Sequence, residues 1–363
     1  MRRVSTAPTV IAVALAYAVF TLLGLALHGA TPLWFVWIGE RWAEGVIGGR
    51  TGYDGQFVLY IARDGWAAVP HLDAPGYRFG RILLPLLARG LSGGNGAALP
   101  WAMLAINYAA AVAGTAALAG WLARRDTAPA WALTYGLSLG LVFAYSRDTT
   151  EPLAYGLAAA GLVAWLEDRR AAGALLLALA GLTRETTLLC IAGLAAPALL
   201  RRRWSAAAVL VLAALPTIGW QLYLAAVLPV PAARLALHFI RLPLAGALPL
   251  VDWEPGRVGG VLFCALPALA LAPGAFAWVA RRPLLPVAWL VALHVLLVLT
   301  LSSQSYSHWL GVARIGLGLV VALVLAFPLL STRLRTAVAA FCVAPLLLWA
   351  PVMLGWAPWT AVR

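Results

Sequence analysis

The sequence has little charge and no lysine. Only 11% of its 363 residues are charged, against about 25% in soluble proteins, and all 26 basic residues are arginines. Its hydrophobic residues make up 63% of the chain, and its mean hydropathy of +0.89 excludes an ordinary soluble domain. We therefore predict an all-α polytopic membrane protein with about ten or eleven transmembrane helices, since that many apolar segments are long enough to cross a bilayer.

Several common kinds of site are also missing. The three cysteines, Cys190, Cys264 and Cys342, stand alone in apolar segments, which indicates buried hydrophobic residues rather than disulfides or metal ligands. Histidines and carboxylates are not paired at helical spacing, so we predict no metal and no cofactor. The pattern gives no support to a divalent ion. The sequence contains no P-loop, dinucleotide-binding, GxSxG or HExxH motif. A soluble nucleotide substrate is therefore not expected.

Clusters of arginine divide the apolar sequence. The positive-inside rule keeps short basic loops in the cytoplasm, and each interval between clusters has room for one crossing out and one back. Topology therefore explains the formal charge of +13 without a nucleic-acid partner. The clusters are Arg2–Arg3, Arg124–Arg125, Arg169–Arg170, Arg201–Arg203, Arg281–Arg282, and Arg333 with Arg335. The predicted spans are 8–28, 99–122, 128–145, 152–166, 171–183, 186–200, 204–227, 258–280, 284–301, 310–328 and 336–356.

This topology places the N-terminus in the cytoplasm and two long loops, residues 29–98 and 228–257, outside. No linker or internal repeat divides the chain, so we predict a single transmembrane domain over residues 1–363. The lysine-free composition, rich in Arg, Ala and Leu, is typical of a high-GC bacterium and indicates a bacterial plasma membrane. Most of the 13 acidic residues fall in the external segments. Any chemistry is therefore expected on the periplasmic or extracellular face.

The first external loop contains the segment Tyr53–Phe57 (YDGQF), followed by an apolar run that predicts an interfacial helix. Asp54 has two interpretations: an N-cap of that helix, or a carboxylate presented to a cavity as a general base. Asp64 is typical of a helix end or a turn, with a second acid as the alternative, and Asp73 is typical of loop bracing. Further along, Arg78 and Arg81 are expected at i and i+3 on a helix, where they bind either a phosphate or lipid headgroups.

Four more charged residues lie beside short spans. Spans 152–166 and 171–183 cover only about 20–23 Å of a hydrocarbon core of about 30 Å. Buried charges must pair or line a watery cavity. Asp148, Glu151, Arg184 and Glu185 are thus either a structural ion-pair cluster, such as Arg184 with Asp148 or Glu151, or the floor of a cavity roofed by the first loop.

One further arginine, Arg314, lies inside a predicted span just past His308. A charge within a span is a functional hypothesis by default, because it is costly to bury. Its expected partner is an anionic ligand group or one of the external carboxylates. The histidine is more often an interfacial or core residue than a ligand, and both interpretations of His308 stay open.

Three segments of the chain resemble the GT-C superfamily of integral membrane glycosyltransferases, which use polyprenyl-phosphate sugars. They are Tyr53–Phe57 (YDGQF), Tyr145–Leu153 (YSRDTTEPL) and Ala180–Thr186 (AGLTRET). The first loop also resembles bacterial cell-surface glycopolymer-formation proteins assigned to this group. The resemblance covers roughly residues 50–190, with a fainter match near Arg314. Asp54 stands alone where many members have a pair of carboxylates.

The resemblance implies a GT-C-like helical bundle and transfer of a monosaccharide from a polyprenyl phosphate to a glycan, lipid or protein outside the cytoplasm. It implies Asp54 as general base and Arg184, Arg314 or both as holders of the donor phosphate, with inversion at the anomeric carbon. The residues expected to complete the binding site are Tyr53, Gln56, Arg78, Arg81, Asp148, Glu151, Glu185 and His308. Two other functions stay open, a flippase for lipid-linked saccharides and a non-catalytic scaffold for envelope assembly.

Overall fold

The computed structural model describes residues 5–46, 49–228, 241–247, 255–306 and 309–347, and within these ranges the chain is helical and has no β-strand. Several of its helices are apolar, in agreement with the predicted class of multi-pass α-helical membrane protein. Four segments are both long and apolar enough to cross a bilayer: α1 (Ala7–Leu27), α7 (Leu99–Ala123), α13 (Trp204–Val227) and Val258–Arg281, which includes α16 (Leu266–Arg281). The count of about ten or eleven crossings stays a prediction.

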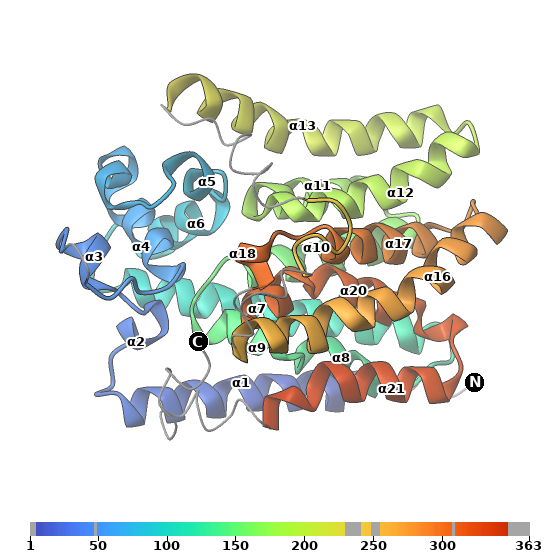
Figure 1. Cartoon of the computed structure of the whole chain (residues 1–363), viewed down its shortest axis with the longest axis horizontal. Helices are drawn as coiled ribbons and strands as arrows, with labels where there is room; N and C mark the ends of the chain where they lie inside the picture. Colours follow the sequence, from blue (N-terminus) through green and yellow to red (C-terminus); the bar gives the residue numbers. More distant parts are fainter. Residues whose placement is uncertain (1–4, 47–48, 229–240, 248–254, 307–308, 348–363) are drawn as a thin grey trace.

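Shorter apolar helices form the centre of the bundle. In Figure 1 they lie between α1 and α21 on one side and α13 on the other. The centre contains α10 (Glu151–Leu166), α11 (Arg170–Thr183), α12 (Leu188–Leu200), α17 (Pro286–Leu299) and α20 (Leu317–Ala326), and α21 is Thr332–Val343. Of these helices, α10, α11, α12 and α17 coincide with predicted spans, whereas α20 forms part of one and α21 begins four residues before the span predicted at 336–356. Most residues of α10 are buried, because it packs against both α7 and α11.

Small residues allow α7 and α10 to pack at close range. A Cβ atom on Gly156 would lie 2.4 Å from the carbonyl oxygen of Ala110, and one on Gly114 would lie 2.9 Å from the Cα of Gly156. Neither position accepts a larger side chain without separating the helices, which is the packing expected of small residues between membrane helices. The close packing fixes α10, whose first residue is Glu151.

Two predicted spans are not continuous helices. The span predicted at 128–145 consists of η2 (Pro129–Ala132), α8 (Leu133–Gly136) and α9 (Leu139–Ser146), and that at 310–328 consists of α19 (Trp309–Ile315), α20 and η5 (Phe327–Leu329). These two interrupted segments contact each other closely through α9 and α19. A Cβ on Gly140 would lie 2.2 Å from the carbonyl oxygen of Ala313, so α9 and α19 touch through their backbones. This contact fixes the position of the next residue, Arg314.

The first predicted external loop forms helices at one end of the bundle, at the left of Figure 1. The helix expected after Asp54 is confirmed as α4, although its location at a membrane interface stays a prediction. The loop contains α2 (Leu33–Val36), α3 (Glu40–Ala43), α4 (Gly55–Asp64), η1 (Gly65–His71), α5 (Pro75–Phe79) and α6 (Leu83–Leu91). It is anchored because α6 packs on α7 and α5 packs on α13. Most of the second loop, residues 228–257, lies outside the described residues.

Candidate functional site

Asp54 lies between two arginines from opposite ends of the sequence. Its Oδ1 is 3.0 Å from Nη1 of Arg78, and its Oδ2 accepts a hydrogen bond from Nη2 of Arg314 at 2.9 Å. The residue occupies the N-cap position of α4, but its side chain makes no capping hydrogen bond. The N-cap interpretation is therefore wrong for the carboxylate, which faces the arginines.

The charge state of Asp54 follows from these two contacts. Burial alone would raise the pKa of the carboxyl, but the Arg78 and Arg314 guanidinium groups outweigh burial and hold the pKa well below its usual range. Asp54 is thus a carboxylate at any ordinary pH. A strongly paired carboxylate is a weak base, so its reactivity depends on how tightly the two arginines hold it.

Arg314 extends the ion pairs into the bundle. Its Nη1 lies 3.3 Å from Oε1 of Glu151, and the same oxygen accepts a hydrogen bond from Nη1 of Arg184 at 2.7 Å. The side chains of Glu151 and Arg184 are 0% and 2% exposed. The proposed pairing of Arg184 with Glu151 is confirmed, whereas that with Asp148 is wrong. The result is a continuous chain of alternating charges, from Arg78 through Asp54, Arg314 and Glu151 to Arg184.

A second ion pair lies beside this chain. Arg81 contacts both carboxylate oxygens of Glu185, at 3.0 and 3.3 Å, and also contacts the hydroxyl of Tyr77. The expectation that Arg78 and Arg81 share one helix is wrong, because α5 ends at Phe79 and Gly80 begins a turn. That turn lets the two arginines reach different carboxylates.

Asp73 braces the first arginine, as its position indicated. Nε and Nη2 of Arg78 each donate to a different carboxylate oxygen of Asp73 at 2.7 Å. This two-point contact leaves Nη1 for Asp54. Such planar, paired contacts fix a guanidinium group far better than a single hydrogen bond does. Arg78 is therefore held in place even when its contact with Asp54 changes.

Aromatic rings cover the arginines. Arg314 lies 5.0 Å from the centre of the Tyr53 ring, Arg78 lies 4.3 Å from that of Phe57, and Arg81 lies 4.0 Å from that of Tyr77. Each contact is short enough for a cation–π attraction, which strengthens where water is excluded. The rings therefore keep the cations oriented without neutralising them.

Two apolar-walled hollows adjoin the ion pairs. A narrow pocket is lined by Asp54, Arg78 and Arg81, and by Thr149 and Thr150 just before α10. Beyond it a groove of about 670 Å³ runs between the loop helices and α13. Ile61 lines both hollows, and Trp66, Trp220 and Tyr223 form an aromatic wall of the groove. The charged cluster and an apolar groove are thus neighbours.

Not every predicted residue faces this cluster. The Asp148 carboxylate is buried and accepts a hydrogen bond from Nδ2 of Asn107 at 2.7 Å. The Gln56 amide bonds to backbone groups, donating to the carbonyl of Thr51 and accepting from the N–H of Gly39. His308 lies outside the described residues. Asn107 was missed, although an asparagine within the apolar α7 was itself a signal.

No metal-binding arrangement is visible in the part of the chain that the structure describes: no three His, Cys, Asp or Glu side chains gather closely enough to hold an ion. The absence of a metal stays a prediction. The chain matches no protein-family model, no curated protein and no solved structure. Function must therefore be argued from the site itself.

Proposed function

We propose that the protein is an inverting membrane glycosyltransferase of the GT-C type, which moves a monosaccharide from a polyprenyl phosphate to an extracytoplasmic glycan, lipid or protein. The observation that carries the proposal is the carboxylate of Asp54 held between Arg78 and Arg314 beside an apolar groove. One site thereby offers a base, cations for a phosphate and a surface for a hydrocarbon chain. A bacterial plasma membrane with this site on its outer side is part of the same proposal.

In the proposed reaction, Asp54 takes the proton from an acceptor hydroxyl group. The acceptor oxygen attacks the anomeric carbon, and the bond from that carbon to the phosphate oxygen breaks. The electron pair leaves with the polyprenyl phosphate, whose growing negative charge the arginines stabilise. The acceptor gains the sugar with inverted configuration, and the proton ends on Asp54. No cofactor is needed for this balance.

The groove supports a lipid-linked donor. It lies directly beyond Phe79 and Ile82, which flank Arg78 and Arg81 in the sequence, so a phosphate at the arginines would direct its hydrocarbon chain into the groove. Its walls are mostly apolar and aromatic. A hydrophilic nucleotide sugar would gain nothing from such a surface, whereas each buried CH₂ of a prenyl chain gains about 0.8 kcal/mol.

Donor binding would also activate the base. Arg78 and Arg314 now depress the pKa of Asp54, so a phosphate that draws on the same two cations would let that pKa rise. The base would then become stronger only once the donor is in place. This order protects the site from unproductive proton uptake.

The first test compares purified wild-type protein with Asp54→Asn and a matched Asp64→Asn control. Asp64 belongs to the same loop, is half-buried, and pairs with Arg63 rather than with an arginine of the Asp54 cluster. Sugar transfer from a panel of polyprenyl-phosphate hexoses and pentoses to cell-envelope acceptor is measured. We expect Asp54→Asn to lose about 10²–10⁴-fold in rate, since it removes general-base catalysis, and Asp64→Asn to keep nearly full rate.

Folding is checked by thermal unfolding of each variant. Equal rates in wild type and a folded Asp54→Asn variant would remove Asp54 from the reaction. A protein that turns over no donor but moves lipid-linked sugar across vesicles would be a flippase. If the folded Asp54→Asn variant still functions in cells and no turnover is found in vitro, the protein is a non-catalytic scaffold for envelope assembly.

A further inference from the structure

A further pocket lies at the end of the bundle opposite the Asp54 cluster. Helix α10 connects the two places, because Glu151 is its first residue and Leu166, its last, lines the pocket. Its 16 residues put the two ends about 24 Å apart. The pocket has a volume of about 160 Å³, is open to the surface, and is lined by the ends of α10 and α12 and the starts of α11, α13 and α17.

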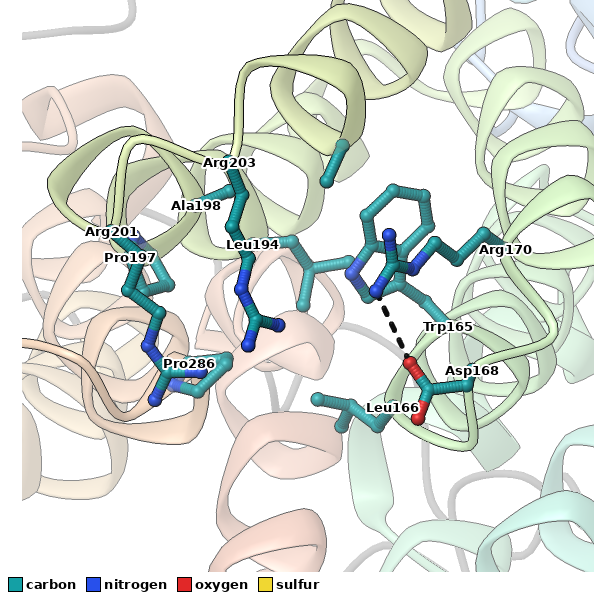
Figure 2. A pocket seen from close by; sticks show the side chains of 11 residues that line it. Trp165, Leu166, Asp168, Arg170, Leu194, Pro197, Ala198, Arg201, Arg203 and Pro286 are labelled. Atoms are coloured by element: carbon teal, nitrogen blue, oxygen red, sulfur yellow. Dashed lines mark hydrogen bonds and ion pairs between the residues drawn. The ribbon is translucent and has the colours of Figure 1, made fainter.

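Positive charge dominates this pocket. Arg170, Arg201 and Arg203 line it, with Asp168 as the only acidic lining residue. Figure 2 shows Arg203 reaching into the middle, with Arg201 on one side and Arg170 on the other. Arg170 pairs with Asp168 at 3.3 Å. The lining therefore carries more cations than its own carboxylate can neutralise.

The arginines differ in how firmly they are held. Nη2 of Arg201 donates to the carbonyl oxygen of Leu284 at 3.0 Å, which leaves its other donors free. Among the described residues, the side chain of Arg203 makes no hydrogen bond and no ion pair. Arg203 thus offers a complete guanidinium fork, the geometry suited to a phosphate.

Three helix starts add to the positive field. None of α11, α13 and α17 has an acidic residue in its first turn or a side-chain cap at its start. The positive dipole ends of α13 and α17 are therefore not offset by nearby carboxylates, whereas Asp168 lies close to the start of α11 and pairs with Arg170. This arrangement reinforces the arginines.

The surroundings of the pocket are apolar. Trp165, Leu194 and Pro197 line its wall. Beside it Leu199, Leu200 and Trp204 are large and exposed, at 47%, 55% and 65%. An exposed tryptophan at the end of an apolar helix is typical of a bilayer interface. Cations in a pocket with an apolar flank suit a phosphate attached to hydrocarbon rather than a small soluble ion.

We propose that this pocket binds the phosphate headgroup of an anionic phospholipid in the leaflet opposite the Asp54 cluster. The guanidinium groups of Arg201 and Arg203 contact the phosphate oxygens, and the acyl chains lie against the exposed leucines of α12. The site is separate from the proposed glycosyl transfer and does not depend on it.

The test measures how much phosphatidylglycerol the purified protein retains, against phosphatidylcholine, by native mass spectrometry after detergent exchange. The variant is Arg201→Gln with Arg203→Gln. Its matched control, Arg333→Gln with Arg335→Gln, removes two charges from the same end of the bundle. Arg335 donates to the carbonyl of Leu330 as Arg201 does to Leu284, so both pairs lose one such bond.

We expect the pocket variant to lose about 25-fold in preference for the anionic lipid, at about fivefold per arginine, and the control to change little. Asp168→Asn should raise retention, because it releases Arg170 from its competing carboxylate. Equal losses in both double variants, or no loss in either, would overturn the proposal. Excess inorganic phosphate is added as a competitor to distinguish the two sources of a phosphate. If it displaces the lipid, the pocket is a site for soluble phosphate and the proposed headgroup site is overturned.

Discussion

Single residues explain why the Asp54 cluster can be buried. Glu151 pairs with both Arg184 and Arg314, and removing one member of such a buried pair typically costs about 3–5 kcal/mol. The sequence made these residues conspicuous, because charges are rare in apolar spans. It could not show which partners pair, since that choice depends on how α10 and α19 approach each other. The separate burial of Asp148 with Asn107 was hidden for the same reason.

The depressed pKa of Asp54 predicts a pH profile. Asp54 stays ionised down to acidic pH, so kcat/KM of the wild type should show no acid limb above about pH 4. The stability that the Asp54 pairs contribute is present above the unfolded pKa of about 3.9 and is lost as the pH falls through the folded value. Arg78→Gln removes one cation while burial remains, so the limb should move to higher pH.

The measurement for this prediction is the pH dependence of transfer by wild type, Arg78→Gln and an Arg63→Gln control. Arg63 contacts Asp64, not Asp54, and its loss should leave the limb in place. An acid limb near neutrality in the wild type would mean that another group controls the reaction.

At the level of helices, apolar length and arginine position predicted most element boundaries closely, as for α7, α11 and α13. They did not predict the breaks near Leu137 and at Gly316. A break within an apolar segment changes only the backbone hydrogen bonds. It adds no charged residue by which the sequence would reveal it. The second interrupted segment carries Arg314, which directly follows the backbone contact between α9 and α19.

The α7–α10 contact gives a prediction on stability. A Cβ at Gly156 would lie 2.4 Å from the Ala110 carbonyl, so Gly156→Ala should destabilise the protein by about 1–3 kcal/mol through forced separation of the helices. Gly274→Ala in α16 is the control, because nothing lies within 4 Å of its Cβ position. The control should be neutral or slightly stabilising, since alanine favours a helix. Unfolding of both variants in the same detergent is compared, and equal stability would contradict the packing argument.

In the whole molecule, two charged places lie at opposite ends of one bundle. The Asp54 cluster balances arginines with carboxylates, whereas the far pocket leaves its arginines in excess. The positive-inside rule assigns the arginine-rich end to the cytoplasm. The separation of the arginine-rich end from the end with the carboxylates was predictable from the sequence. This separation depends on the order of the charges along the chain and not on which charges pair.

Orientation can be tested with single cysteines in a cysteine-free parent. Ala97 is exposed just before α7, on the side of the loop helices, and Thr332 is exposed at the start of α21. A membrane-impermeant maleimide should label Ala97→Cys in intact cells and Thr332→Cys only after permeabilisation. The reverse pattern would invert the topology and place the Asp54 cluster in the cytoplasm.

The contact between Asp54 and Arg314 also has a consequence for biosynthesis. The two residues are 260 positions apart, so at about 5–20 residues per second a ribosome needs roughly 13–50 s to add the arginine after the aspartate. Arg78 is available within a few seconds and can neutralise the carboxylate meanwhile. A nascent chain is therefore spared an unpaired acid in its first loop, while the full pair of cations forms only after Arg314 has been added.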